Sequence, residues 1–256
     1  MNNQSSIVII TGATSGFGAA MARNYAAAGA KIVAIGRNQK KLIELQNEIG
    51  EKCACLDLDV ADMDAIKISL DSLPAEFSKP TILINNAGLS VGNAIVPKQE
   101  INDWNRMVDT NIRVVLNMTH AVLPGMVERN FGDVINISSI ASSIPYPGGN
   151  VYGASKAFVK QFTLNLRADL IGKNIRAICI EPGTARTGFA SVRLGSEEAA
   201  SNFYKQPNLL EAQDVADIAL FCTSLPRRVN INMLEVMPIS QSFSFPAMAV
   251  DMPIVS

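Results

Sequence analysis

Short apolar runs alternate with longer helical patterns along the chain. Runs rich in Ile, Val and Leu predict strands over residues 7–11, 32–36, 53–57, 82–86, 134–138, 175–181 and 233–238. Each segment between two strands is long enough for one helix. Because the runs are mostly apolar throughout, both faces of the sheet are expected to be buried. The pattern therefore predicts an α/β protein with a doubly wound Rossmann fold, in which seven parallel strands carry helices on both faces.

One domain is expected over residues 1–256, because no repeat, low-complexity tract or linker marks a boundary. Residues 184–212, which lie between the sixth strand and the next helix, are interpreted as a variable substrate lid. The tail, residues 241–256, is apolar but contains two prolines, so we expect no helix there. It covers either a neighbouring subunit or the core of its own chain.

Charge and cysteine content exclude several classes of function. The net charge is −1 and no basic run occurs, so a nucleic-acid or polyanion partner is not expected. A small molecule is the expected partner. The stretch MNNQSSIVIITG has too short an apolar run for a signal peptide or membrane span, which predicts a soluble, cytoplasmic protein. Cys53, Cys55, Cys179 and Cys222 form no CxxC motif beside the single His120, so we expect reduced thiols and no metal site.

A glycine-rich motif, TGATSGFG, follows the first strand and opens the first helix. Gly12 permits a sharp turn and Gly16 lets backbone amides approach a pyrophosphate, while Gly18 allows the helix to pack closely on the strand. The phosphates then lie at the positive end of the helix dipole. The motif predicts a dinucleotide site, and a plain strand-to-helix turn is the alternative.

Residues after the next strands indicate which nucleotide binds. An acidic residue after the second strand would accept hydrogen bonds from the ribose, whereas this chain has Gly36 and then Arg37. Since the helix dipole opposes arginine at a helix start, a bound 2′-phosphate is the better explanation, and NADP is predicted over NAD. Asp59 either accepts a hydrogen bond from adenine or caps a helix. The amides of NNAG, residues 85–88, either link adjacent strand ends or face a cofactor.

The candidate chemistry lies in GNVYGASKAF, where Tyr152 and Lys156 are four residues apart and share one helix face. Ser138 and Ser139 end the fifth strand, and the following loop can return Ser139 to the phenol. An isolated tyrosine has a pKa of about 10, and a neighbouring ammonium lowers it. The pair is interpreted as a proton donor and acceptor for catalysis near neutral pH, with an ordinary surface pair as the alternative.

These motifs resemble those of the short-chain dehydrogenase/reductase family, and the similarity covers nearly the whole chain: TGATSGFG, NNAG, Asn111 in DTNIR, Ser139, YGASK and PGTART. The resemblance implies that Tyr152 is the general acid/base, that Ser139 binds the substrate oxygen, that Lys156 holds the nicotinamide ribose, and that Asn111 anchors a water. The implied cofactor-binding residues are Thr11, Gly12, Thr14, Ser15, Gly16, Phe17, Gly18, Arg37, Asn38, Asp59, Val60, Asn86, Ala87, Gly88, Tyr152, Lys156, Pro182, Gly183, Thr184 and Thr187.

Four further segments, VLPGMVERN, PYPGGNVYGASKAFVKQF, SVRLG and VNINMLEVMP, resemble the NADP-dependent 3-hydroxy acid dehydrogenases that act on serine and allo-threonine. Two features depart from that subgroup: Asn38 replaces a basic residue, and the loop after the sixth strand carries Arg186. A hydroxy acid needs a carboxylate-binding group, for which Arg193 and Arg186 are candidates, with solvated lid arginines as the alternative. Tyr146 either lines the pocket or is an exposed turn residue.

The resemblance also implies a homotetramer, with a dimer as the next possibility. His120 and Trp104 are interpreted as core or interface residues. The predicted activity is the interconversion of a secondary alcohol and a carbonyl. The alternatives are a carbonyl or ketoacyl reductase of other substrate range and a catalytically silent NADP-sensing protein.

Overall fold

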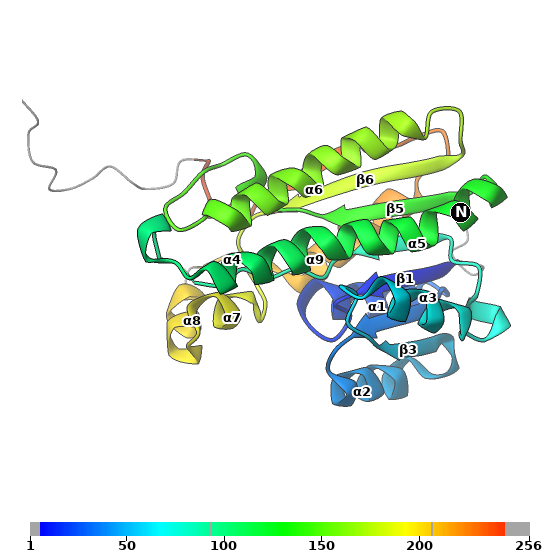
Figure 1. Cartoon of the computed structure of the whole chain (residues 1–256), viewed down its shortest axis with the longest axis horizontal. Coiled ribbons are helices and arrows are strands. Elements are labelled where there is room, and N and C mark those ends of the chain that lie inside the picture. The colour runs from blue at the N-terminus through cyan, green and yellow to red at the C-terminus, as the bar shows by residue number, and fades with distance from the viewer. Residues whose placement is uncertain (1–5, 93, 206, 244–256) are drawn as a thin grey trace, which may run out of the picture.

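The computed structural model describes residues 6–92, 94–205 and 207–243. The predicted strands form one parallel sheet in the order β3-β2-β1-β4-β5-β6-β9 (Figure 1). Their bounds are β1 Ile7–Thr11, β2 Lys31–Gly36, β3 Cys53–Asp57, β4 Ile82–Asn85, β5 Gly132–Ile137, β6 Ile175–Pro182 and β9 Met233–Val236. The Rossmann fold and all seven predicted strands are therefore confirmed, with ends that shift by at most two residues.

The helices cover both faces of this sheet (Figure 1). The helices of the described residues are α1 Gly16–Ala27, α2 Gln39–Ile49, α3 Met63–Asp71, α4 Ile101–Val108, α5 Val114–Arg129, α6 Asn150–Asp169, α7 Phe189–Leu194, α8 Glu197–Phe203 and α9 Ala212–Ser224; of these, α1, α2 and α9 pack on one face and α3, α5 and α6 on the other. Short 3₁₀ turns are η2 Gly50–Lys52, η3 Ala75–Phe77, η4 Val96–Lys98 and η6 Ile140–Ser142, and Asp109–Arg113 forms a π-helical turn, η5.

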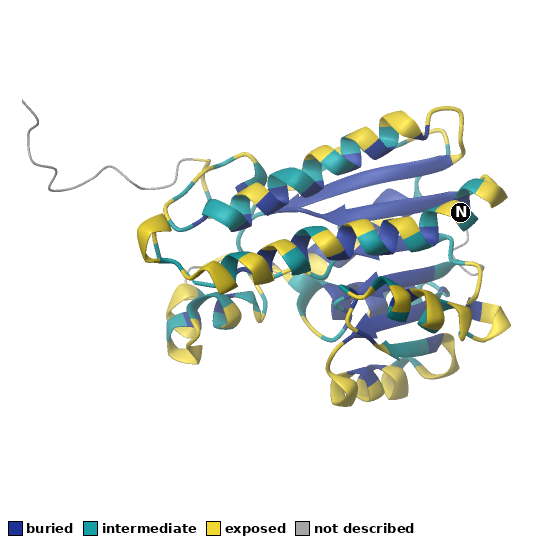
Figure 2. Cartoon of the chain, in the orientation of Figure 1, coloured by how far each residue is buried: buried dark blue, intermediate teal, exposed yellow. Residues whose placement is uncertain are grey.

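Two apolar layers fill the space between sheet and helices. On one face, Val8 and Ile10 of β1 pack with residues of α1, α2 and α9. On the other face, Ile9 packs with residues of α3, α5 and α6. Consecutive strand residues thus point into different layers, and Figure 2 shows the strands buried between the helices. Burial on both faces explains why the strand segments are apolar throughout.

The order of the sheet also places the site. The chain passes outward from β1 to β3, then crosses back so that β4 lies on the other side of β1. In an open parallel sheet, a crevice forms at this reversal, outside the carboxyl ends of the strands. The glycine-rich turn after β1 and the NNAG segment after β4 therefore lie next to each other.

At the opposite end of the sheet, buried charges join β5, β6 and the segment after α9. Arg176 of β6 makes two hydrogen bonds to Asp133 of β5, at 2.7 and 2.8 Å. Arg227 donates to the same carboxylate at 2.6 Å. The pairing explains why β5 begins two residues before its apolar run: Asp133 is polar, yet it is buried in the sheet.

The segment interpreted as a lid contains α7, α8 and a small parallel sheet of β7 Ala185–Arg186 and β8 Leu210–Glu211. Of the tail, residues 244–256 lie outside the described residues. Cys53, Cys179 and Cys222 are buried and Cys55 is half-buried; all four are free thiols, with 3.8 Å between the sulfurs of Cys53 and Cys55. Across the described ranges, no helix is both long and apolar enough to cross a membrane.

Candidate active site

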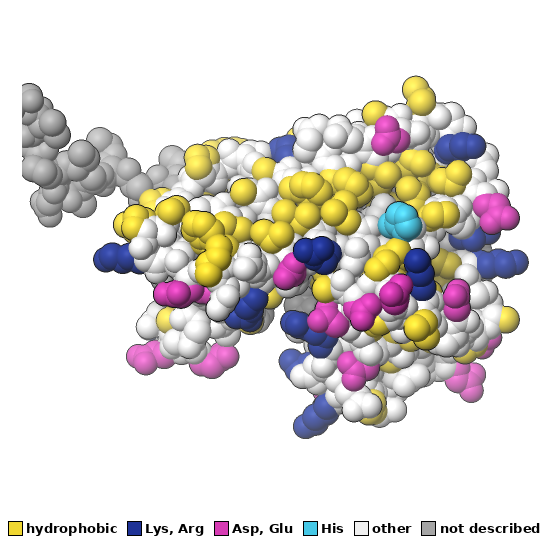
Figure 3. Space-filling view, in the orientation of Figure 1, with side chains coloured by type: hydrophobic (Ala, Val, Ile, Leu, Met, Phe, Trp, Pro, Cys, Tyr) yellow, Lys and Arg dark blue, Asp and Glu magenta, His cyan; other side chains and the backbone are white. Residues whose placement is uncertain are grey.

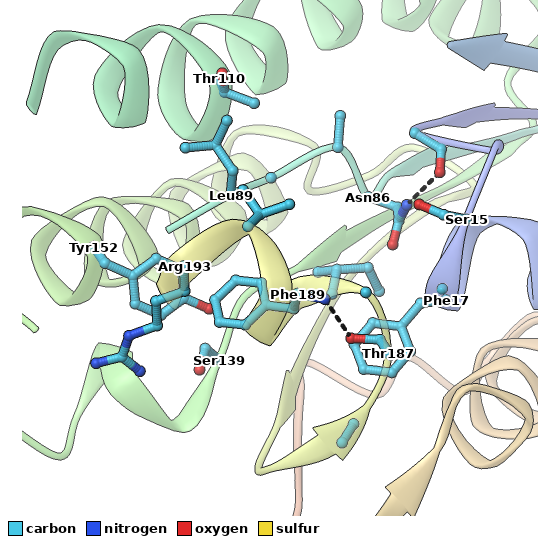
Figure 4. Close-up of a pocket in the computed structure, with 18 of the residues that line it drawn as sticks. Ser15, Phe17, Asn86, Leu89, Thr110, Ser139, Tyr152, Thr187, Phe189 and Arg193 are labelled. Carbon is cyan, nitrogen blue, oxygen red and sulfur yellow. Dashed lines mark hydrogen bonds between the residues drawn. The ribbon is translucent and has the colours of Figure 1, made fainter. Parts of the chain in front are cut away.

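A cleft with a volume of about 1410 Å³ lies along the carboxyl ends of the strands. It begins at Gly12 and Ser15 in the glycine-rich turn, passes Ala87 and Gly88 after β4, and reaches Tyr152 on α6. The two halves of the predicted site therefore share one continuous cavity. Figure 4 shows residues of both halves around it.

The glycine-rich turn has the backbone conformation that the motif predicts. Gly12 and Gly16 have φ angles of +67° and +50°, in the left-handed region that favours glycine. A Cβ on Gly18 would lie 2.3 Å from the carbonyl oxygen of Gly12, so helix α1 approaches the turn as closely as the sequence analysis expects. Ser15 is the N-cap of α1, and its side chain makes no capping hydrogen bond. The first amides of α1 consequently offer an anion site at the cleft wall.

The NNAG amides link adjacent strand ends, which is one of the two readings that the sequence leaves open. Asn85 links neighbouring strands, because its Nδ2 donates to Oδ1 of Asn136 in β5 at 2.8 Å. Asn86 turns toward the glycine-rich motif, where its Nδ2 donates to the carbonyl oxygen of Thr11 at 2.9 Å. The hydroxyl of Thr11, in turn, accepts from the amides of Asn86 and Ala87. Thr11 thus shapes the cleft from the buried side without lining it.

The nucleotide end of the cleft is lined by Arg37, Asn38, Asp59 and Val60. Arg37 is exposed, and no carboxylate of the described residues pairs with it. Asn38 caps α2 by accepting from the amide of Lys41 at 3.1 Å. The carboxylate of Asp59 accepts from the amide of Ala61. The N-cap of α3 is Asp62, so Asp59 does not cap that helix.

At the other end, Ser139, Tyr152 and Lys156 meet, and each is less than a tenth exposed. Nζ of Lys156 lies 5.9 Å from the centroid of the Tyr152 ring and donates to the carbonyl oxygen of Ile137 at 2.9 Å. Oγ of Ser139 faces the same end of the cleft, where it accepts from the amide of Ala141 at 3.2 Å and donates to the carbonyl oxygen of Pro182 at 3.5 Å. Ser138, by contrast, donates to the carbonyl oxygen of Lys156 at 2.8 Å and anchors α6 to the end of β5.

Burial dominates the electrostatics of this group. It raises the pKa of Tyr152 above its ordinary value, and the Ser139 hydroxyl only partly opposes this rise. Burial also lowers the pKa of Lys156 to about 8. The net shift is therefore opposite to the lowered pKa expected for Tyr152 beside Lys156. Its ammonium lies over the ring and bonds to a carbonyl, so its attraction does not outweigh the loss of solvation.

Asn111 lies in the π-helical turn between α4 and α5, buried behind the cleft. Its Oδ1 accepts from the amide of Leu89, and its Nδ2 donates to the carbonyl oxygen of Leu89, both at 2.8 Å. Nδ2 also donates to Oγ of Ser155 on α6 at 2.9 Å. The side chain thus joins the loop after β4 to the helix that carries Tyr152. π-Helical turns often mark functional sites, and no apolar period in the sequence reveals this one.

The predicted substrate residues separate into two groups. Tyr146 and Arg193 line the cleft, and the guanidinium of Arg193 lies 5.1 Å from the centroid of the Tyr146 ring. Nε of Arg193 is shielded from solvent and has no hydrogen-bond partner among the described residues. Arg186 instead points away from the cleft and pairs with Glu211 at 3.2 Å on the surface. Its selection as a carboxylate binder is therefore not supported, because β7 turns alternate side chains to opposite sides.

Sequence reasoning missed two features beside the phenol. Phe189 of the lid helix α7 packs on Tyr152, with 5.5 Å between the ring centroids. Figure 4 shows its ring between Tyr152 and Thr187. Glu181 is fully buried at the end of β6, where Lys160 of α6 donates to it at 3.1 Å and Ser142 also bonds to it. A charged residue closing an apolar strand run was the available signal for Glu181.

Of the remaining cofactor candidates, Thr14, Gly16, Phe17, Pro182, Gly183, Thr184 and Thr187 line the cleft, whereas Gly18 packs beneath it. Lys156 and Gly88 approach each other closely, since a Cβ on Gly88 would lie 3.1 Å from Nζ. Trp104 is half-buried against the apolar cluster that contains Tyr152, and His120 is exposed on α5. Across the described ranges, no group of acidic, His and Cys side chains could hold a metal ion.

Comparison with known proteins agrees with this arrangement. Residues 6–197 match the family model described as short chain dehydrogenase. The chain is 49% identical over 240 residues to the NADP-dependent 3-hydroxy acid dehydrogenase YdfG of Escherichia coli O6:H1, covering 93% of this chain and 97% of that protein. It is 46% identical to the serine 3-dehydrogenase of Agrobacterium fabrum, covering 94% and 96%.

The structure is also similar to the closed form of a serine dehydrogenase complexed with NADP⁺, with a TM-score of 0.92 and 46% identity over 96% of this chain and 99% of that one. A 3-ketoacyl-(acyl-carrier-protein) reductase from Brucella melitensis gives a TM-score of 0.83 at 26% identity, covering 91% and 97%. The sequence motifs, the sheet order and these matches lead to one conclusion: the chain belongs to the short-chain dehydrogenase family.

Proposed function

We propose that this protein is an NADP-dependent oxidoreductase that interconverts the 3-hydroxyl of a small 3-hydroxy acid, such as serine or L-allo-threonine, with the corresponding carbonyl. The observation that carries the proposal is the single cleft that joins the glycine-rich turn to Ser139, Tyr152 and Lys156. The names of the two similar enzymes, a 3-hydroxy acid dehydrogenase and a serine 3-dehydrogenase, support this substrate class.

The residues present fit NADP. The positive φ angles of Gly12 and Gly16 leave backbone amides free to approach phosphates, and Arg37 supplies an exposed cation where a 2′-phosphate would lie. Asp59 and Val60 would border the adenine, and Lys156 the nicotinamide ribose. When bound, NADP supplies the carbon that accepts or releases hydride. The chain's own contribution is position, exclusion of water and proton transfer.

Proton transfer is assigned to Tyr152. Because burial raises its pKa, the phenol is protonated at neutral pH and is ready to donate to a developing alkoxide in the reducing direction. Ser139 holds the substrate oxygen beside the phenol. In the oxidising direction the phenol must first release its proton, so oxidation is expected to accelerate as the pH rises.

The substrate carboxylate is assigned to Arg193. Its guanidinium lies on the face of Tyr146 at the same end of the cleft as Tyr152, and its unpaired Nε needs an acceptor. A bidentate pair with a carboxylate satisfies that need. Arg193→Met should therefore raise the KM for a hydroxy acid at least tenfold while changing the KM for a neutral secondary alcohol little, given about 1.5–3 kcal/mol for a charge-assisted bond. Arg186→Met, which removes a surface arginine outside the cleft, is the matched control.

The direct test of the function is to follow NADPH formation at alkaline pH with serine, L-allo-threonine and 3-hydroxyisobutyrate beside a neutral secondary alcohol. We expect turnover of the hydroxy acids and its loss in Tyr152→Phe. Turnover of the neutral alcohol alone would contradict the hydroxy-acid assignment. It would favour a carbonyl reductase with a different range of substrates. A Tyr152→Phe variant with wild-type turnover would remove the assigned acid/base.

Cofactor choice is tested separately. We expect the wild-type protein to prefer NADP over NAD, and Arg37→Ala to raise the KM for NADP while leaving that for NAD unchanged, since only NADP carries the 2′-phosphate. A preference for NAD that is unaltered in Arg37→Ala would contradict the assignment.

A homotetramer in the cytoplasm completes the proposal. Figure 3 shows hydrophobic side chains gathered in a band over α5 and α6, near the exposed His120. Leu116 of α5 is an exposed apolar residue. Apolar residues on the surface of a monomer are usually scattered singly, whereas these form a continuous band. A second copy of the chain would cover it. Sedimentation velocity is expected to give a tetramer, and Leu116→Lys a smaller species; a monomeric wild type would contradict the assembly.

The proposed location in the cytoplasm is tested by cell fractionation.

A further inference from the structure

The lid helix α7 cannot be stable by itself. It has only six residues, and isolated helices of this length do not persist in water. Its N-cap is Gly188, which has no side chain to accept hydrogen bonds from the first-turn amides. Thr187 supplies one substitute, because its Oγ1 accepts from the amide of Phe189 at 3.2 Å. The amide of Ala190 still requires a partner.

Tyr204, the residue that follows α8, provides it. Its hydroxyl accepts from the amide of Ala190 at 3.0 Å and from the amide of Thr187 at 3.4 Å. The same hydroxyl donates to the carbonyl oxygen of Thr187. One phenol oxygen therefore holds the start of α7 in place from a different helix, in the position where a capping serine or threonine usually acts.

The position of α7 determines what faces the catalytic phenol. Phe189, at its first residue, packs on Tyr152, and Arg193, near its last turn, lies over Tyr146. The far end of the helix is fixed as well, since the amide of Gly92 donates to the carbonyl oxygen of Arg193 at 3.1 Å. Tyr204 thus attaches the start of the helix, and Gly92 its end.

We propose that Tyr204 is a positioning residue, which acts through α7 to hold Phe189 against Tyr152 and Arg193 over Tyr146. The inference rests on the proposed function, because it assumes that substrate binds between Arg193 and Tyr152. Loss of the Tyr204 hydroxyl should loosen the start of α7, weaken substrate binding and admit water to Tyr152. The far end of the cleft, at Arg37 and Asp59, is formed by other elements and should be unaffected.

The test uses Tyr204→Phe in the full chain, which removes one oxygen and keeps the ring. For a net hydrogen-bond contribution near 1 kcal/mol, we expect kcat/KM for the hydroxy acid to fall by about fivefold to tenfold, mostly through KM. The KM for NADP should change less than the KM for the hydroxy acid, because Tyr204 reaches the cofactor candidates through Thr187 alone. Tyr25→Phe is the matched control: its buried hydroxyl also bonds to two groups, Ala219 and Thr223, but outside the cleft. That variant should lower Tm and leave kcat/KM unchanged.

A second readout needs no turnover. Trp104 is the chain's only tryptophan and packs in the same apolar cluster as Tyr152 and Phe189. Its emission should shift to longer wavelength and become more accessible to iodide in Tyr204→Phe, but not in Tyr25→Phe. Wild-type KM together with wild-type emission in Tyr204→Phe would overturn the proposal. If serine is not a substrate, the fluorescence result still decides the role of Tyr204, whereas Tyr152→Phe decides the chemistry.

Discussion

Replacing the buried Lys156 by methionine tests two properties separately. It shows how much the buried ammonium lowers the stability of the fold, and whether catalysis requires it. The side chain is 5% exposed, and burial lowers its pKa from 10.5 to about 8. Each pKa unit corresponds to about 1.4 kcal/mol, so keeping the ammonium charged in the folded protein at neutral pH costs about 3 kcal/mol. Methionine fills a similar volume and carries no charge. We therefore expect Lys156→Met to be inactive, yet at least as stable as the wild type at neutral pH.

The same shift fixes how stability depends on pH. Between about pH 8 and 10.5 the unfolded chain keeps the proton of Lys156, whereas the folded chain has lost it. The free energy of unfolding therefore rises with pH through this window, because the unfolded state binds more protons there. Below pH 8 both states are protonated, and the group contributes no slope. The variant lacks this contribution at every pH.

Urea unfolding followed by circular dichroism measures the difference between the two proteins. From about pH 7 to about pH 9.5 the wild type should gain about 2 kcal/mol relative to Lys156→Met, since 9.5 lies about 1.5 units above the folded pKa. Lys67→Met, which removes an exposed ammonium on α3, is the control and should follow the wild-type curve. A difference between wild type and Lys156→Met that stays constant over this range would refute the claim that burial sets the charge of Lys156.

Two further substitutions test the turn and the buried ion pairs. Gly18→Ala places a Cβ 2.3 Å from the carbonyl oxygen of Gly12, so the phosphate turn must shift; overpacking of about 1–3 kcal/mol should lower Tm and weaken NADP binding by more than tenfold in a calorimetric titration. Unchanged NADP affinity would show that the turn does not hold the phosphates. Asp133→Asn leaves Arg176 and Arg227 without their shared carboxylate and should cost about 3–5 kcal/mol in urea unfolding, while kcat of the folded protein is retained. A loss below about 1 kcal/mol would mean that the pair adds little.

The fold could be predicted because the strands are apolar on both faces, and that property is visible in a linear sequence. The features that could not be predicted depend on how deeply a side chain is buried. Asp133 and Glu181 look like surface residues, but each is buried with a cationic partner. The spacing of Tyr152 and Lys156 gave their proximity correctly, whereas the direction of the Tyr152 pKa shift depends on how little solvent reaches the phenol. No sequence pattern carries that information.

Lid geometry was equally inaccessible, for a different reason. Strands of two residues and a helix of six have too few positions to show a period, so β7, β8 and α7 left no pattern. Their arrangement follows instead from single tertiary contacts, such as the one between Tyr204 and Ala190. The same fact explains why Arg186 and Arg193 could not be distinguished: only the course of the backbone shows which one faces the cleft.

Helix α6 explains how the site and the core are joined. Its buried face begins with Tyr152 and Lys156 and continues to Thr163, with the half-buried Lys160 beside it. Thr163 accepts from Nδ2 of Asn136 at 2.8 Å, and Asn136 in turn binds Asn85, so the face ends in an amide network between β4 and β5. Burying these polar groups is costly, and partners from the strands balance Thr163, Asn136 and the Nδ2 of Asn85. Tyr152 is therefore positioned by the center of the sheet, whereas α7 on the other side of the phenol is held by a few hydrogen bonds from single residues.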